Sequence, residues 1–203
     1  MTSLTKKKSY MSEEDNAYTQ QLKAFQVLQA FSIEELLGFT NNGGVWNHCP
    51  DGDIELLDYL RKFNERIHGA GPPGGPLNFC PGLFGGFEQF HEDSALYSIA
   101  NLFEAKETKT LCLATHFPCG MAKKHKHTIQ EVVHMAYIAH IRFCTDLQKR
   151  LNALLVMAGF PHLQLKSDRV FSFFHGAKLI SGIVEENTYI FNPYKYAEHF
   201  VTS

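Results

Sequence analysis

The sequence predicts an α/β fold in which helices flank a mostly parallel central β-sheet. Short apolar segments, such as 45–49 and 109–115, alternate with longer segments that repeat apolar residues at helical spacing. Gly- and Pro-rich stretches separate these segments, as loops do. The chain has 203 residues and is 44% hydrophobic, so it is long enough to bury the core that such a sheet requires.

Composition narrows the possible functions. The 19 Lys and Arg nearly balance the 21 Asp and Glu, so no strong overall charge favours nucleic acid or anionic membrane as a partner. No apolar run reaches the roughly 18 residues of a membrane helix, and none follows Lys6–Lys8 as a secretory signal would require. We therefore expect a cytoplasmic protein. Its five cysteines are too few and odd in number for a disulfide framework, which favours metal binding or catalysis.

The N-terminal part is expected to be helical. Residues 1–12 read as a disordered leader, 13–40 as a helical arm, and 41–203 as the α/β domain. Ser12 and the acids after it favour the start of a helix whose apolar spacing continues through Leu28, and Ser32 favours a second helix over 33–37. The amphipathic segment 13–31 either packs on a second copy of the chain or folds onto its own sheet.

The middle of the chain predicts a strand over 45–49 and a helix over 53–67. The segment 69–76 holds so many Gly and Pro residues that we expect neither a helix nor a central strand there, and a stretch of this kind often lies close to a ligand. A helix beginning at 91–94 then leads to the buried strand 109–115, which runs into a loop at His116.

The C-terminal third predicts one long helix followed by strands. Thr128 and Glu131 form a capping-box pattern that opens a helix reaching Met157. Strands are expected over 170–174, 177–184 and 188–191. Ligand sites in parallel sheets gather at the carboxyl ends of the strands, and both Cys49 and the His116–Cys119 pair fall at such ends.

These residues suggest a zinc site. An imidazole at 116 and a thiol at 119 can face one point on a strand-to-loop turn, and Gly120 lets that turn fold close to an ion. Cys49 is the best candidate for a third ligand and Cys80 the alternative. Cys112 and Cys144 are expected to be ordinary buried side chains.

The order of these motifs resembles the β-class carbonic anhydrases, most closely their divergent bacterial relatives. The resemblance spans about 45–191 and rests on Cys49-Pro50-Asp51, the Gly-rich loop, the His116–Gly120 motif and Phe174-His175-Gly176. It implies Zn²⁺ held by Cys49, His116 and Cys119, and reversible hydration of CO₂ to bicarbonate by a zinc-bound hydroxide. It also implies a homodimer or higher homo-oligomer, with Phe117 and Gly120 on the substrate side.

The resemblance makes Asp51 the catalytic carboxylate, but one feature departs from the family pattern. There the aspartate pairs with an arginine two positions later, and the pair leaves the fourth zinc position to water. Here that position is Asp53. Without the arginine, we expect Asp51 to be drawn to the metal and to impair the site, unless Arg61, Arg66 or a lysine of 123–126 replaces it.

Two other functions stay open. A zinc-dependent nucleotide or base deaminase would use His91 and the Pro118-Cys119 pair, although Asp93 and Ala122 stand where its glutamate and second cysteine are expected. A non-catalytic pseudoenzyme would keep a structural zinc, or none, and act as an assembly subunit. The lysine-rich segment 123–127 is either a solvated loop or a feature that attracts anions.

Overall fold

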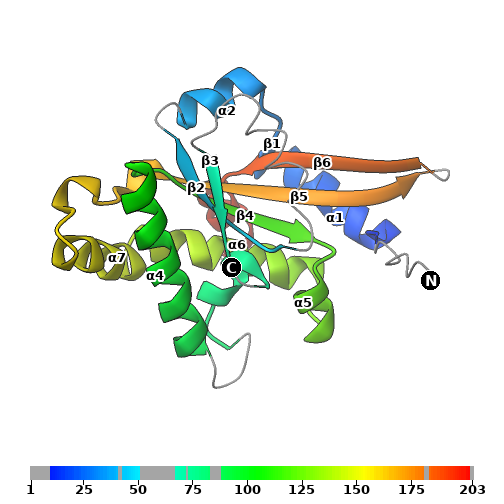
Figure 1. Cartoon of the computed structure of the whole chain (residues 1–203). Helices are drawn as coiled ribbons and strands as arrows, with labels where there is room; N and C mark the ends of the chain where they lie inside the picture. Colours follow the sequence, from blue (N-terminus) through cyan, green and yellow to red (C-terminus); the bar gives the residue numbers. More distant parts are fainter. Residues whose placement is uncertain are drawn as a thin grey trace, which may run out of the picture.

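The computed structural model describes residues 10–40, 43–50, 67–71, 73–82, 88–180 and 183–201. They form the predicted α/β fold, with a six-stranded mixed sheet in the order β1-β6-β5-β4-β2-β3 (Figure 1). The strands are β1 (Leu28–Gln29), β2 (Gly44–His48), β3 (Ile67–Ala70), β4 (Leu111–Phe117), β5 (Val170–Ile180) and β6 (Ile183–Phe191). The helices are α1 (Glu13–Ala24), α2 (Ile33–Phe39), α4 (Glu88–Lys106), α5 (Gly120–Lys124), α6 (Ile129–Phe143), α7 (Asp146–Met157) and α8 (Pro193–Tyr196).

The sheet is mostly parallel, as the sequence predicts. Strands β3, β2, β4 and β5 run in one direction, whereas β6 is antiparallel to both β5 and β1. In the β2–β4 pair, His48 lies opposite Ala114. The carboxyl ends of these two strands therefore open onto the same edge of the sheet.

Helices cover both faces of the sheet (Figure 1). On one face, α4, α6 and α7 enclose the largest apolar cluster, to which the sheet contributes side chains such as Val45, Leu111 and Leu113. On the other face, Leu36 of α2 packs with Trp46, whose ring stacks on Phe173 at a centroid distance of 4.6 Å. None of the described helices is both long enough and apolar enough to cross a membrane.

The N-terminal segment packs onto the sheet of its own chain. Ser12 caps α1 as expected, but the prediction that the helix continues through Leu28 was wrong. The helix ends at Ala24, and Gln26 adopts a left-handed backbone (φ 58°) that turns the chain. Leu28 then pairs with Phe191 of β6, and both belong to an apolar cluster that includes side chains of α6.

Other boundaries differ from the sequence-based expectation. The long helix predicted from Ile129 to Met157 is two helices, because the backbone of Thr145 (φ −133°, ψ −98°) leaves the helical region between α6 and α7. The three predicted C-terminal strands are the two long strands of the β5–β6 hairpin.

The segment around the Gly- and Pro-rich loop also differs. Ile67, the expected last residue of a helix, begins β3, and the rest of that predicted helix lies outside the described residues. Gly75–Phe79 forms a short 3₁₀ helix, although we expected no helix there, because Pro76 fits at the start of such a turn. The strand β3 is at the edge of the sheet, where glycine is tolerated.

Candidate metal centre

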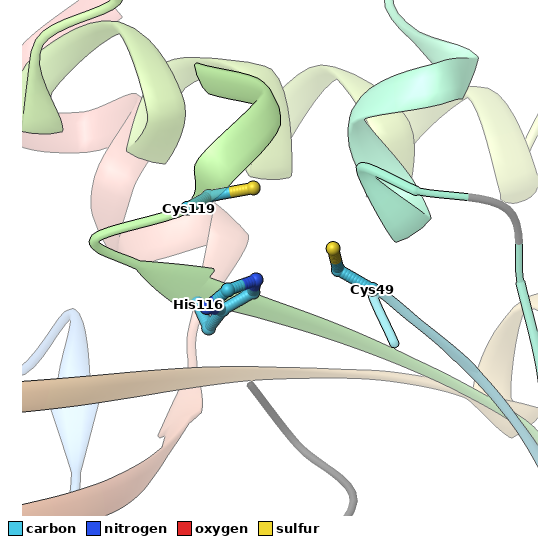
Figure 2. Close-up of side chains that lie close together, drawn as sticks. All are labelled: Cys49, His116 and Cys119. Carbon is cyan, nitrogen blue, oxygen red and sulfur yellow. The ribbon is translucent and has the colours of Figure 1, made fainter. Parts of the chain in front are cut away.

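Three side chains converge at the carboxyl ends of β2 and β4. The Cys49 and Cys119 sulfurs and a ring nitrogen of His116 all lie within 4.8 Å of one another. All three residues are buried, with exposed fractions of 0% for Cys49, 5% for His116 and 2% for Cys119. The three side chains point toward one another in Figure 2. The structure thus brings together the three residues that the sequence analysis selects.

Cys49 is fixed by the Gly- and Pro-rich loop that follows β3. The backbone N–H of Gly74 donates a hydrogen bond to the Cys49 sulfur, with an N–S distance of 3.2 Å. A donated N–H stabilises negative charge on sulfur, and partners of this kind orient metal ligands. The sequence predicts that this loop lies near a ligand but does not identify the Gly74 N–H as the donor. Its signal is the Pro-Pro-Gly-Gly run, which marks a tight backbone turn.

Glycine is required where this loop contacts the end of β2. A Cβ atom at Gly71 would lie 2.2 Å from the backbone oxygen of His48. At Gly75 it would lie 2.5 Å from the backbone nitrogen of Cys49, and Gly75 also has a positive φ of 52°. Side chains at these two positions would push the loop away from β2 and move the donor away from the Cys49 sulfur.

His116 and Cys119 are placed by the end of β4 and the start of α5. The strand extends two residues further than predicted, so His116 lies within β4 and pairs with His175 of β5. The Phe117–Pro118 peptide is cis, and Cys119 then caps α5 by accepting a hydrogen bond at its backbone oxygen from the Lys123 N–H (2.9 Å). Gly120 is the first residue of α5.

Apolar side chains surround the two thiols. Cys49 and Cys119 belong to one buried cluster with Leu77, Ala122 and Val132. Phe117, Met121 and Met135 are partly buried and pack against this cluster. The site is therefore shielded from bulk water, which strengthens electrostatic interactions between the side chains and any ion that they hold.

The donor set fits a zinc ion. Thiolate and imidazole are the ligands that Zn²⁺ takes most often, at about 2.3 Å for sulfur and 2.0–2.1 Å for nitrogen. Ligand atoms at the corners of such a tetrahedron lie about 3.5–3.8 Å apart. Side-chain shifts of about 1 Å therefore bring these three residues to zinc-binding distances. The group could hold a metal ion through three protein ligands.

The other cysteines lie apart from this group. The Cys80 thiol donates a hydrogen bond to the backbone oxygen of Met135 (2.9 Å), and burial raises its pKa to about 12. Cys112 is buried, as predicted, but it is the second residue of β4 because the strand begins at Leu111, and burial raises its pKa as well. Cys144 is half-buried at the end of α6. Asp51 and Asp53 lie outside the described residues, as do Arg61 and Arg66.

The carboxylates of the deaminase hypothesis are engaged elsewhere. Asp93, which would stand for the catalytic glutamate, forms an ion pair with Arg150 of α7. The neighbouring Glu92 is buried and pairs with both Arg150 and Arg142. These contacts join α4 to α6 and α7 and occupy both carboxylates with arginine, so they give no support to a deaminase site.

Comparison with known proteins assigns the chain to no family. No protein-family model matches the chain, and no curated protein matches it. We therefore infer the function from the three converging side chains and from the resemblance of the sequence.

Proposed function

We propose that the chain is a zinc enzyme that hydrates CO₂ to bicarbonate, with Cys49, His116 and Cys119 as the metal ligands. The observation that carries the proposal is the convergence of these three buried side chains from two strand ends. The β-class carbonic anhydrase resemblance of the sequence supplies the reaction, and the ligand set supports the metal.

The ligand set is typical of catalytic zinc. Catalytic sites use three protein ligands and keep the fourth position for water or substrate. When bound in such a site, Zn²⁺ supplies Lewis acidity and lowers the pKa of water from 15.7 to about 7. The chain's own contribution is to hold the ligands in place, and the Gly74 N–H does this at the Cys49 sulfur.

Burial and apolar surroundings favour a small uncharged substrate. The three ligands are at most 5% exposed, and Leu77, Ala122 and Val132 pack around the thiols. Phe117 lies at the edge of this cluster, where its ring would exclude water from one side of the reacting molecule. CO₂ fits such surroundings better than a nucleoside, whose polar groups would be buried without hydrogen-bond partners.

We assign Asp51 the role of orienting the attacking oxygen by accepting its hydrogen bond. This role follows from the sequence position of Asp51, two residues after Cys49. If Asp51 instead occupies the fourth position, the protein will bind zinc and show little activity. In that case Asp53→Arg should raise CO₂ hydration, because a guanidinium would hold the carboxylate away from the metal.

Zinc content and stopped-flow CO₂ hydration, measured together on the purified full chain, test the proposal. We expect about one zinc per chain and hydration above the buffer rate. The double variant Cys49→Ser/His116→Ala should lose both. Cys144→Ser is the matched control, because it removes a thiol outside the site and should keep both.

The outcomes separate the hypotheses. Zinc that persists in the double variant would show that the ligands are wrongly assigned. Stoichiometric zinc with no hydration, in the parent and in Asp53→Arg, would favour the non-catalytic zinc protein. Circular dichroism of the double variant distinguishes loss of metal from loss of fold, and Cys49→Asp, which keeps a zinc-binding side chain, should retain part of the metal affinity.

A further inference from the structure

Five consecutive basic residues lie next to the candidate metal centre. They are Lys123, Lys124, His125, Lys126 and His127, here called the basic turn. We propose that the basic turn attracts small anions to the metal centre, with Lys124 and Lys126 as the residues that favour an anionic ligand over a neutral one. This inference rests on the proposed function, since it concerns the same site.

Backbone hydrogen bonds hold the basic turn in one conformation. The His125 N–H donates to the Met121 oxygen (3.2 Å), and the His127 N–H donates to the Ala122 oxygen (2.9 Å). Lys126 adopts a left-handed backbone with φ 59°. The imidazole rings of His125 and His127 stack at a centroid distance of 6.2 Å. The charges of this segment are therefore carried on a folded turn.

The basic turn begins at the metal centre. Helix α5 starts directly after Cys119, and its third residue, Ala122, is fully buried in the apolar cluster that holds the Cys49 and Cys119 thiols. Lys123 follows Ala122 directly. Figure 2 shows the first turn of α5 rising from Cys119 beside the three ligands. The lysines thus follow a residue that packs on the site.

The charges of the metal ligands and of the basic turn indicate which of the two attracts anions. Two thiolates and a neutral imidazole cancel the two positive charges of Zn²⁺, so the ion with its three ligands carries no net charge that would attract a distant anion. Lys124 and Lys126 are exposed, and within the described ranges Glu131 is an acid that contacts the turn, 3.6 Å from the Nδ1 atom of His127. Lys124 and Lys126 therefore add two exposed positive charges to the segment that follows the site.

The ligand class is a small anion that a compact, buried site can admit. Bicarbonate, the product of the proposed reaction, belongs to this class. In water, unit charges separated by about 10 Å still interact, and this interaction is weakly screened at 0.01 M ionic strength, where the Debye length is about 30 Å. Removing two such charges should weaken anion binding about threefold.

The experiment uses the full chain loaded with Co²⁺, whose visible spectrum reports binding at the metal. Thiocyanate is the anionic probe and imidazole the neutral one. In Lys124→Gln/Lys126→Gln we expect the Kd of thiocyanate to rise about threefold at low ionic strength, with the Kd of imidazole unchanged. The difference between variant and parent should shrink at 0.15 M salt.

The matched control is Lys149→Gln/Lys166→Gln, which removes two exposed lysines, one in α7 and one just before the 3₁₀ turn Ser167–Arg169. Figure 1 shows α7 on the opposite side of the molecule from α5. An unchanged thiocyanate Kd in Lys124→Gln/Lys126→Gln would overturn the inference. So would an equal effect in the control, or equal weakening of imidazole. If the Co²⁺ spectrum lacks thiolate-to-metal absorption, the proposed function fails and the inference fails with it, whereas normal absorption with unselective binding refutes the inference alone.

Discussion

Buried cysteines lie both at the carboxyl ends of β2 and β4 and near the amino end of β4, but in different surroundings. Cys112, the second residue of β4, packs among Trp46, Ala114 and Phe173, and burial keeps its thiol protonated by raising its pKa. Cys49, at the strand end, has a second sulfur, an imidazole and a backbone N–H within reach. Both are fully buried. Burial therefore does not distinguish a candidate ligand from a core residue, whereas the neighbouring donor groups do.

The largest expected effect tests directly whether the strand-end cysteines and Cys112 differ in zinc binding. Cys119→Ala should abolish stoichiometric zinc binding, because two ligands remain. Cys112→Ala removes the same atoms from the middle of the sheet, and should keep the zinc while lowering the free energy of unfolding by about 1 kcal/mol. Metal analysis and urea denaturation check both variants. Full zinc retention in Cys119→Ala would show that the two regions do not differ as described.

The loop that holds Cys49 gives the second effect. Gly71→Ala would place a Cβ 2.2 Å from a backbone oxygen and should lower the free energy of unfolding by about 3 kcal/mol or more, with weaker zinc binding. Gly38, in α2, is the matched control, because a Cβ there meets nothing within 4 Å. Gly38→Ala should stabilise the protein by about 0.5–1 kcal/mol. Denaturation with and without added zinc measures both, and equal effects would refute the close-packing argument.

Two buried histidines extend the comparison to pH. His116 lies beside the thiols, whereas the Nδ1 atom of His140 in α6 is 2.9 Å from the Ser172 hydroxyl oxygen. Burial lowers the pKa of His140 to about 4, below its usual 6.5. His140 is thus neutral in the folded chain at pH values where the unfolded chain binds a proton. Its destabilising effect is absent well above pH 6.5, grows as the pH falls from 6.5 to 4, and levels off below pH 4.

We therefore expect the free energy of unfolding to fall by about 3 kcal/mol between pH 6.5 and 4 on account of His140. The variant His140→Phe/Ser172→Ala removes both polar partners together and should lose this part of the pH dependence. Chemical denaturation over the same pH range compares it with the parent. An identical pH slope in the two proteins would exclude His140 as its source.

The smallest expected effect concerns Cys80, the alternative ligand of the sequence analysis. Its thiol donates to a backbone oxygen of α6, and a serine hydroxyl can do the same. Cys80→Ser should therefore change the free energy of unfolding by about 1 kcal/mol or less and leave zinc content unchanged. Loss of zinc in this variant would indicate that Cys80 is a metal ligand.

Sequence patterns predict the parts of this fold that depend on local chemistry. Ser12, Ser32 and Thr128 cap helices as their positions suggest, and the apolar segments at 45 and 111 are strands. The helix predicted through Leu28 failed because apolar spacing continues past the point where Gln26 turns the chain, and pairing with β6 decides the outcome. The spacing of apolar residues along the sequence does not reveal tertiary contacts of this kind.

The candidate site is predictable for a related reason. Parallel pairing places strand ends at one edge, so Cys49 and the His116–Cys119 pair could be expected to meet. The N–H donor of Gly74 could not be assigned, because every residue except proline carries that group and its use depends on loop conformation. The role of Asp51 stays a prediction, since this residue lies outside the described part of the chain.

The hydrogen bond from the Gly74 N–H to the Cys49 sulfur connects the candidate metal centre to β3, the outermost strand of the described sheet. Strand β3 has β2 as its single neighbour in the described sheet, and the loop that leaves it reaches back to the Cys49 sulfur. Fraying of this outermost strand would loosen one ligand's support, and a metal ion in place would oppose the fraying. Slower amide hydrogen exchange in Ile67–Ala70 on adding zinc would be the sign of this coupling.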